Sequence, residues 1–203
     1  SVKKRYDCII FDLGNVILGF DYNLSIKKLK AKSKIDPERV YELFFDSELT
    51  RLHDTGKISS RSFYKKVLKA LEIDLSFDEF AEIWNDIFFE DKAVSNLIRK
   101  VKKNHKVMLL SNTNKMHFDF IRKKFNIIKE FDELILSYKA RALKPESAIY
   151  RLAIEKSKTT PERIFYTDDR ADLVDGAKSH GIDAVVFKNY EILKQVLTEK
   201  NIL

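Results

Sequence analysis

The chain has 203 residues, of which 44% are hydrophobic, and it carries a formal net charge of +7. This size suits one folded core with a substantial insertion, or two small domains, and no apolar run is long enough to span a membrane. The only cysteine is Cys8, which excludes an intramolecular disulfide framework. Because no secretory signal is visible either, we expect a cytoplasmic protein.

The positive charge is spread along the chain, and most lysines and arginines alternate with apolar residues, as on solvated helix faces. No zinc-finger spacing, RNA-binding aromatic motif or arginine-rich arm is present. We therefore expect neither a nucleic acid nor a membrane as partner. The sequence carries no signal for an oligomeric state.

The first predicted element is a buried strand over residues 6–11, and it ends in a carboxylate. The apolar run reaches Phe11, Asp12 follows it, and Gly14 lies in the turn beyond. A strand of this kind places its carboxylate at the carboxyl end of a parallel sheet. Open α/β sheets hold their ligands at that edge.

Residues 20–91 show helical periodicity alone. Asp36-Pro37-Glu38 is typical of a helix start, and Ser76 with Glu79 forms a capping box before another helix. This stretch predicts an all-helical insertion, a cap, long enough to be its own small domain.

Strands and helices alternate after the insertion, which predicts an α/β fold with a doubly wound parallel sheet. We expect Pro145 in the first turn of one of these helices. The predicted core comprises residues 1–19 and 92–203. The later apolar runs cover residues 106–111, 133–137, 163–167 and 183–187.

Polar residues stand at the ends of these predicted elements. Ser111 and Asn112 follow the second core strand, Lys144 precedes a predicted helix, and Asp168 and Asp169 follow the fourth core strand. Two strands that end in carboxylates bring together the oxygen ligands that a hard cation such as Mg²⁺ prefers.

This order of motifs, with a helical insertion after the first, resembles the haloacid dehalogenase superfamily, which consists mostly of Mg²⁺-dependent phosphatases. The first motif, DLGNV, and the later stretch DDRADLVDGA are similar to a branch whose known bacterial member is an α-D-glucose-1-phosphate phosphatase. The resemblance implies a Rossmann-like core and hydrolysis of a small phosphate monoester. The expected substrate is a sugar phosphate such as glucose 1-phosphate.

The resemblance also implies roles for the acidic residues. Asp12 would be the nucleophile and would form an aspartyl-phosphate intermediate. Asp12, Asp168 and the backbone carbonyl of Gly14 would hold the Mg²⁺ ion. Asp172 would be a further carboxylate near the metal, and Asp169 would hold Lys144 or a metal-bound water.

The remaining roles concern the phosphoryl group. Ser111 and the amide of Asn112 would bind its oxygens, and Lys144 would neutralise both the nucleophile and the transferring group. In the predicted cap, Glu48, Arg51 and His53 are candidates to face the site; the alternative is that they lie on a surface helix.

Gly14 departs from the family pattern, because most members carry an aspartate there that acts as acid and base. Three interpretations stay open: the leaving group is acidic, as an anomeric hydroxyl is; another carboxylate such as Asp21 or Asp169 acts through water; or the chain binds phosphate ligands without turnover. A metal-independent 2-haloacid dehalogenase is a further alternative. The acidic residues that begin at Asp168 argue against that alternative.

Overall fold

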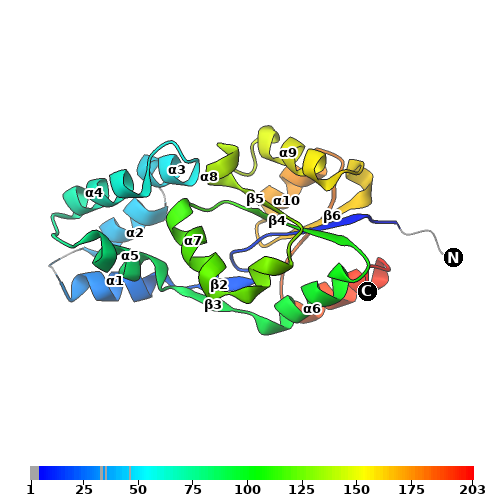
Figure 1. Ribbon diagram of the computed structural model, residues 1–203, viewed down its shortest axis with the longest axis horizontal. Helices are drawn as coiled ribbons and strands as arrows, with labels where there is room; N and C mark the ends of the chain where they lie inside the picture. Colours follow the sequence, from blue (N-terminus) through cyan, green and yellow to red (C-terminus); the bar gives the residue numbers. More distant parts are fainter. Residues whose placement is uncertain (1–4, 33, 35, 46) are drawn as a thin grey trace.

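The computed structural model describes residues 5–32, 34, 36–45 and 47–203, so residues 1–4 of the predicted core lie outside the described residues. A five-stranded parallel sheet forms the centre, in the order β5-β4-β1-β6-β7 (Figure 1). This confirms the predicted α/β sheet. Its strands are β1 (Cys8–Phe11), β4 (Lys106–Ser111), β5 (Glu133–Leu136), β6 (Ile164–Asp168) and β7 (Asp183–Val186).

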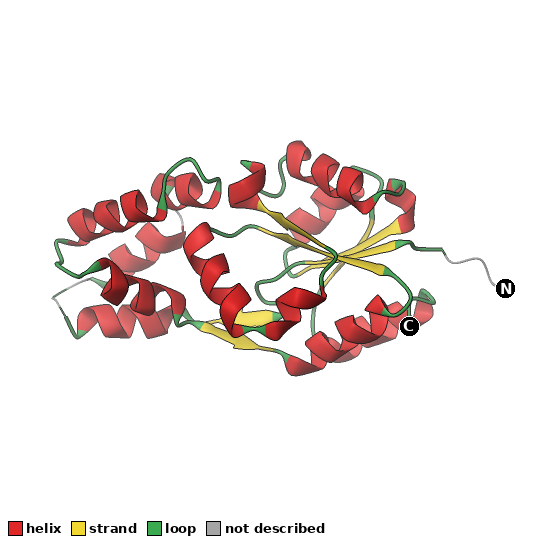
Figure 2. Cartoon of the chain, in the orientation of Figure 1, coloured by secondary structure: helices red, strands yellow, loops and turns green. Residues whose placement is uncertain are grey.

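Helices cover both faces of the sheet (Figure 2). Because successive strand residues point to opposite faces, Ile9 and Phe11 pack with α6 and α11, whereas Cys8 and Ile10 pack with α9 and α10. These helices and their neighbours are α6 (Lys92–Lys102), α7 (Lys115–Lys124), α8 (Ser137–Ala140), α9 (Ser147–Ser157), α10 (Ala171–Lys178) and α11 (Tyr190–Glu199). Two short 3₁₀ helices are η1 (Asn126–Glu130) and η2 (Pro161–Arg163).

Five helices gather at one end of the molecule around their own apolar cluster, which includes Phe63 and Trp84 (Figure 1). The predicted capping box is present, since Ser76 and Glu79 each accept the other's backbone N–H. The division of the chain at residues 20 and 91 stays a prediction. The helices are α1 (Tyr22–Lys30), α2 (Pro37–Phe45), α3 (Glu48–Asp54), α4 (Ser60–Leu71) and α5 (Phe77–Asn85).

Two short antiparallel strands, β2 (Leu18–Phe20) and β3 (Phe88–Glu90), lie where the chain enters and leaves this helical group. The sequence analysis missed them because three residues are too few to show a strand period. Gly19 leaves room for the Phe89 ring, since a Cβ at this position would lie 2.1 Å from the ring and would force it to move.

The expected position of Pro145 is wrong, because α9 begins later, at Ser147. The side chain of Asn112 holds the backbone of Lys144 through both its N–H, at 2.8 Å, and its C=O, at 3.1 Å. These contacts fix the backbone of Lys144 in the turn ahead of the helix. Within the described residues, no helix combines the length and apolar character needed to cross a bilayer.

Candidate active site

The candidate site lies at the carboxyl edge of the central strands. Asp12 directly follows β1, and its backbone N–H donates to the carbonyl of Thr167, 3.1 Å away. β1 pairs with β4 on one side and with β6 on the other. The ends of these three strands therefore bring Asp12, Ser111 and Asp168 to one edge, as the sequence predicted.

Lys144 is the centre of a buried polar cluster. Its Nζ lies 3.0 Å from Asp12 Oδ1 and 2.7 Å from Asp168 Oδ2. It also lies 3.0 Å from the Leu110 carbonyl and 3.0 Å from the Tyr166 hydroxyl. The lysine side chain is 1% exposed, which shields these ion pairs from solvent.

The two carboxylates are not equivalent. Burial raises the pKa of Asp12, and the nearby Lys144 ammonium only partly offsets this effect. Burial alone would also raise the pKa of Asp168, but the charge of Lys144 and hydrogen bonds from Lys144 and Tyr166 hold it below its ordinary value. For Lys144, burial opposes the charged form, yet the two carboxylates outweigh burial and raise its pKa.

Asp169 completes a group of three carboxylates. Oxygens of Asp12, Asp168 and Asp169 lie within 4.8 Å of one another. Asn15 donates to Asp169 at 3.2 Å. When all three carboxylates are ionised, the single ammonium of Lys144 leaves an excess of two negative charges. This all-oxygen donor set fits a hard divalent cation.

Ser111 and Asn112 lie beside this cluster, but the structure gives them different surroundings. The Asn112 side chain is occupied by the backbone of Lys144. The buried Ser111 hydroxyl has a long contact of 3.5 Å to the Asn112 carbonyl. That distance exceeds the usual range for an O–H···O bond, so the hydroxyl can donate to a ligand.

Other sequence candidates lie outside the cluster. Asp172 forms an exposed ion pair with Arg170, 2.7 Å away. Arg51 pairs on the surface with Glu146, 3.4 Å away, and Glu48 is exposed. Asp21 caps helix α1 by accepting the N–H of Asn23. Among the described residues, the group of close carboxylates consists of Asp12, Asp168 and Asp169.

Sequence reasoning missed two residues of the cluster. The Tyr166 hydroxyl donates to Asp168, and Asn15 supports Asp169. Tyr166 had a usable signal, because residues two apart on a strand point to the same face. Asn15 had none, since its contact depends on a positive φ of 60° in the turn after β1.

A small cavity of about 120 Å³ opens between the helical group and the core. Gly14, Ser111 and Asn112 line its core side, and Asp54 at the end of α3 lines the opposite side. Asp54 therefore belongs to the candidate site, although the sequence analysis did not select it.

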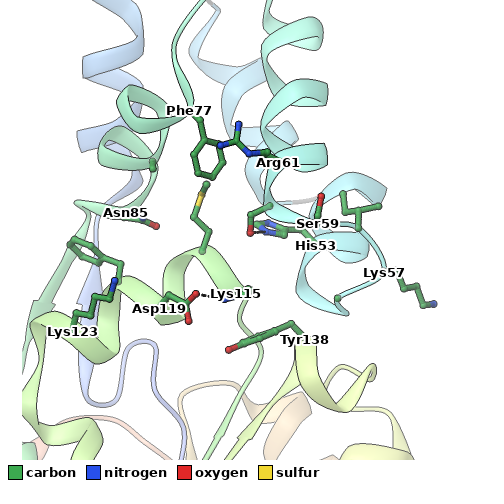
Figure 3. Close-up of a pocket in the computed structure, with 16 residues that line it drawn as sticks. His53, Lys57, Ser59, Arg61, Phe77, Asn85, Lys115, Asp119, Lys123 and Tyr138 are labelled. Carbon is green, nitrogen blue, oxygen red and sulfur yellow. Dashed lines mark hydrogen bonds and ion pairs between the residues drawn. The ribbon is translucent and has the colours of Figure 1, made fainter.

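A larger groove of about 810 Å³ lies on the other side of the α3 end, between α4, α5, α7 and α8 (Figure 3). His53 lines this groove and not the small cavity. Its ring stacks on Phe63 at 4.2 Å, and its Nε2 lies 3.0 Å from the Ser60 hydroxyl. His53 thus packs within the helical group, away from the carboxylates.

Known proteins share this architecture. A HAD family enzyme, bt-2542 from Bacteroides thetaiotaomicron, solved with magnesium and inorganic phosphate, is 23% identical with a TM-score of 0.82, over 90% of this chain and 94% of that one. A predicted HAD-like family hydrolase from Porphyromonas gingivalis is 20% identical with a TM-score of 0.82, over 95% and 98%. These likenesses concern the fold.

A curated relative, the phosphorylated carbohydrates phosphatase of Thermotoga maritima, is 25% identical over 128 residues. The match covers 59% of this chain and 59% of the relative. The family model for haloacid dehalogenase-like hydrolases matches residues 6–181, which include the strand ends, the helical group and the Lys144 turn. The chain therefore belongs to the haloacid dehalogenase-like hydrolases.

Proposed function

We propose that this protein is a magnesium-dependent phosphatase that hydrolyses small phosphate monoesters through an aspartyl-phosphate on Asp12. The observation that carries the proposal is the geometry around Lys144, whose Nζ lies between the carboxylates of Asp12 and Asp168. The phosphatase relative from Thermotoga maritima and the magnesium and phosphate in the Bacteroides enzyme support it.

Asp12 is suited to attack phosphorus because its backbone is fixed at the end of β1 and one of its oxygens is held by Lys144. An anionic nucleophile is repelled by an anionic phosphate, so positive charge has to be present where the two meet. Lys144 supplies one such charge and is itself positioned by the Leu110 carbonyl and Tyr166.

Asp12, Asp168 and Asp169 would hold the magnesium ion, together with the backbone carbonyl of Gly14. When bound, the ion would offset the remaining negative charge and polarise the phosphoryl oxygens. Asn15 keeps Asp169 oriented toward the other two carboxylates. Ser111 and the backbone amide of Asn112 would bind the phosphoryl oxygens through neutral hydrogen bonds.

The substrate we propose is a sugar phosphate such as glucose 1-phosphate. The small size of the cavity favours a compact metabolite as the leaving group. Two observations support this substrate class. The Thermotoga relative is named a phosphorylated carbohydrates phosphatase, and the chain carries the DLGNV motif.

The test is phosphate release from p-nitrophenyl phosphate, sugar phosphates, nucleotides and 2-haloacids, with Mg²⁺ and with a chelator. The proposal predicts Mg²⁺-dependent release from phosphate esters and no halide release. Chelator-resistant dehalogenation would instead place the chain with the haloacid dehalogenases. Binding of phosphate without turnover would make it a ligand-binding module.

A further inference from the structure

The structure points to Asp54 as the residue that protonates the leaving-group oxygen, and we propose it as the acid and base of the reaction. This inference rests on the proposed phosphatase function. Gly14 has no side chain, so another residue would have to supply the proton that an aspartate at this position gives in most family members. An alkoxide leaves phosphorus slowly unless a proton reaches its oxygen as the bond breaks.

Asp54 lies on the side of the cavity toward which the leaving group would point. Gly14, Ser111 and Asn112 lie on the core side, where the phosphoryl group would bind, so the leaving group would point toward the helical side. Asp54 lines that side, at the end of α3. Among the described residues that line the cavity, it is the only one with a carboxyl group.

Two hydrogen bonds hold Asp54 against the core. Its Oδ1 accepts from Asn114 Nδ2 at 3.2 Å, and its carbonyl accepts from the Ser137 hydroxyl at 2.6 Å. Asn114 is itself fixed, because its Oδ1 caps α7 at the N–H of His117. Within the described part of the chain, Asp54 Oδ2 has no hydrogen-bond partner and can carry the proton that is transferred.

The protonation state agrees with this role. Burial raises the pKa of Asp54 to about 7, while the Asn114 hydrogen bond acts in the opposite direction. The other titratable groups on the cavity wall are poor donors. Burial raises the pKa of Tyr22 above its ordinary value and lowers the pKa of His117 to about 3, so the histidine is neutral.

The steps balance. The Asp12 carboxylate forms a bond to phosphorus as the ester P–O bond breaks, and Asp54 gives its proton to the departing oxygen, which leaves as an alcohol. Water then attacks the phosphorus of the aspartyl-phosphate, and Asp54 takes a proton from that water. Phosphate leaves, and both aspartates return to their starting states.

The test compares leaving groups. In Asp54→Asn, kcat/KM for glucose 6-phosphate or another alkyl phosphate should fall by about 10²–10⁴-fold. For p-nitrophenyl phosphate, whose phenolate departs unaided, it should fall by less than about tenfold. The asparagine keeps the acceptor for Asn114, so the contact to the core is preserved. Asp74→Asn is the matched control: it makes the same change at an exposed position between α4 and α5, away from the cavity, and should leave both values near those of wild type.

Wild-type protein provides a second measurement that does not depend on the variant folding. Its kcat/KM for the alkyl phosphate should fall above about pH 7, where Asp54 loses its proton, more steeply than that for p-nitrophenyl phosphate. Equal losses on both substrates in Asp54→Asn, or parallel pH profiles in the wild type, would overturn the role of Asp54. Absence of any Mg²⁺-dependent hydrolysis of p-nitrophenyl phosphate by the wild type would instead overturn the phosphatase function.

Discussion

Lys144 Nζ lies 3.0 Å from Asp12 and 2.7 Å from Asp168, and these three residues come from three separate segments of the chain. The contact joins the end of β1, the turn before α9 and the end of β6. Burying an ammonium and two carboxylates costs desolvation energy, which their mutual attraction offsets. Loss of one of these groups leaves a buried charge without its partner and destabilises the fold. The cluster therefore couples the stability of the fold to the charges that the proposed reaction needs.

Removing the lysine charge should destabilise the protein. Lys144→Met leaves two buried carboxylates without their ammonium and should lower the free energy of unfolding by about 3–5 kcal/mol. Urea denaturation measures this change. Lys139→Met, at an exposed position of α8, is the control and should stay within about 0.5 kcal/mol of wild type. Equal stability of the two variants would contradict the account of the cluster.

Removing a proposed metal ligand should shift the Mg²⁺ requirement. Asp168→Ala should raise the Mg²⁺ concentration for half-maximal activity, with partial recovery at high Mg²⁺. It should also reduce the increase in melting temperature that Mg²⁺ gives the wild type, because a ligand stabilises only the state that binds it. Asp175→Asn, exposed on α10, is the control. An unchanged Mg²⁺ response in Asp168→Ala would place the metal elsewhere.

Position 14 should accept an acidic side chain. Gly14 does not have a positive φ, and a Cβ there would lie 3.1 Å from the edge of the Phe20 ring, which has to move slightly. In the Asp54→Asn background, Gly14→Asp should therefore restore activity on glucose 6-phosphate by about tenfold or more, or about 1.4 kcal/mol of barrier. Gly14→Asn has the same shape without the acid and should restore nothing. Equal rescue by both would rule out proton donation.

Buried histidines should make the fold less stable in acid. Burial lowers the pKa of His117 to about 3 and that of His53 to about 4, from an ordinary value of 6.5. Below pH 6.5 the unfolded chain binds protons that the folded chain does not, so each histidine stabilises the fold fully above pH 6.5 and less as the pH falls. The slope is about 1.4 kcal/mol per pH unit for each histidine.

Asp54 acts in the opposite direction between pH 3.8 and 7, because its raised pKa makes the folded state bind the proton. Comparing a histidine variant with wild type cancels the contribution of Asp54 and leaves that of the histidine. His117→Gln should reduce the loss of stability between pH 6.5 and 4 by about 1.4 kcal/mol per pH unit relative to wild type. Chemical denaturation at several pH values measures it. Parallel curves for the two proteins would mean that His117 is protonated in the fold.

The sheet and its strand-end residues were predictable from the sequence because buried parallel strands are continuous apolar runs. Asp12, Ser111 and Asp168 directly follow such runs, so knowing the strands was enough to place them at one edge. Lys144 does not follow such a run, and its role was implied by the resemblance to a known family.

Other features depend on contacts between distant segments. The pairing of β2 with β3 joins residues about seventy positions apart, as Gly19 and Phe89 show. Asp54 reaches the site only because Asn114 and Ser137 hold the end of α3 against the core. In the sequence Asp54 is one of many aspartates, and no local pattern distinguishes it from those on the surface.

The most direct test of the account is to trap the phosphorylated enzyme. Wild-type protein mixed with Mg²⁺ and a phosphate ester labelled on phosphorus, then quenched in acid during turnover, should carry the label on the peptide that contains Asp12. Asp12→Asn should carry none and should lose at least about a thousandfold in kcat, as removal of a nucleophile does. Label on another residue, or rapid turnover with no labelled protein at any time, would contradict Asp12 as the nucleophile.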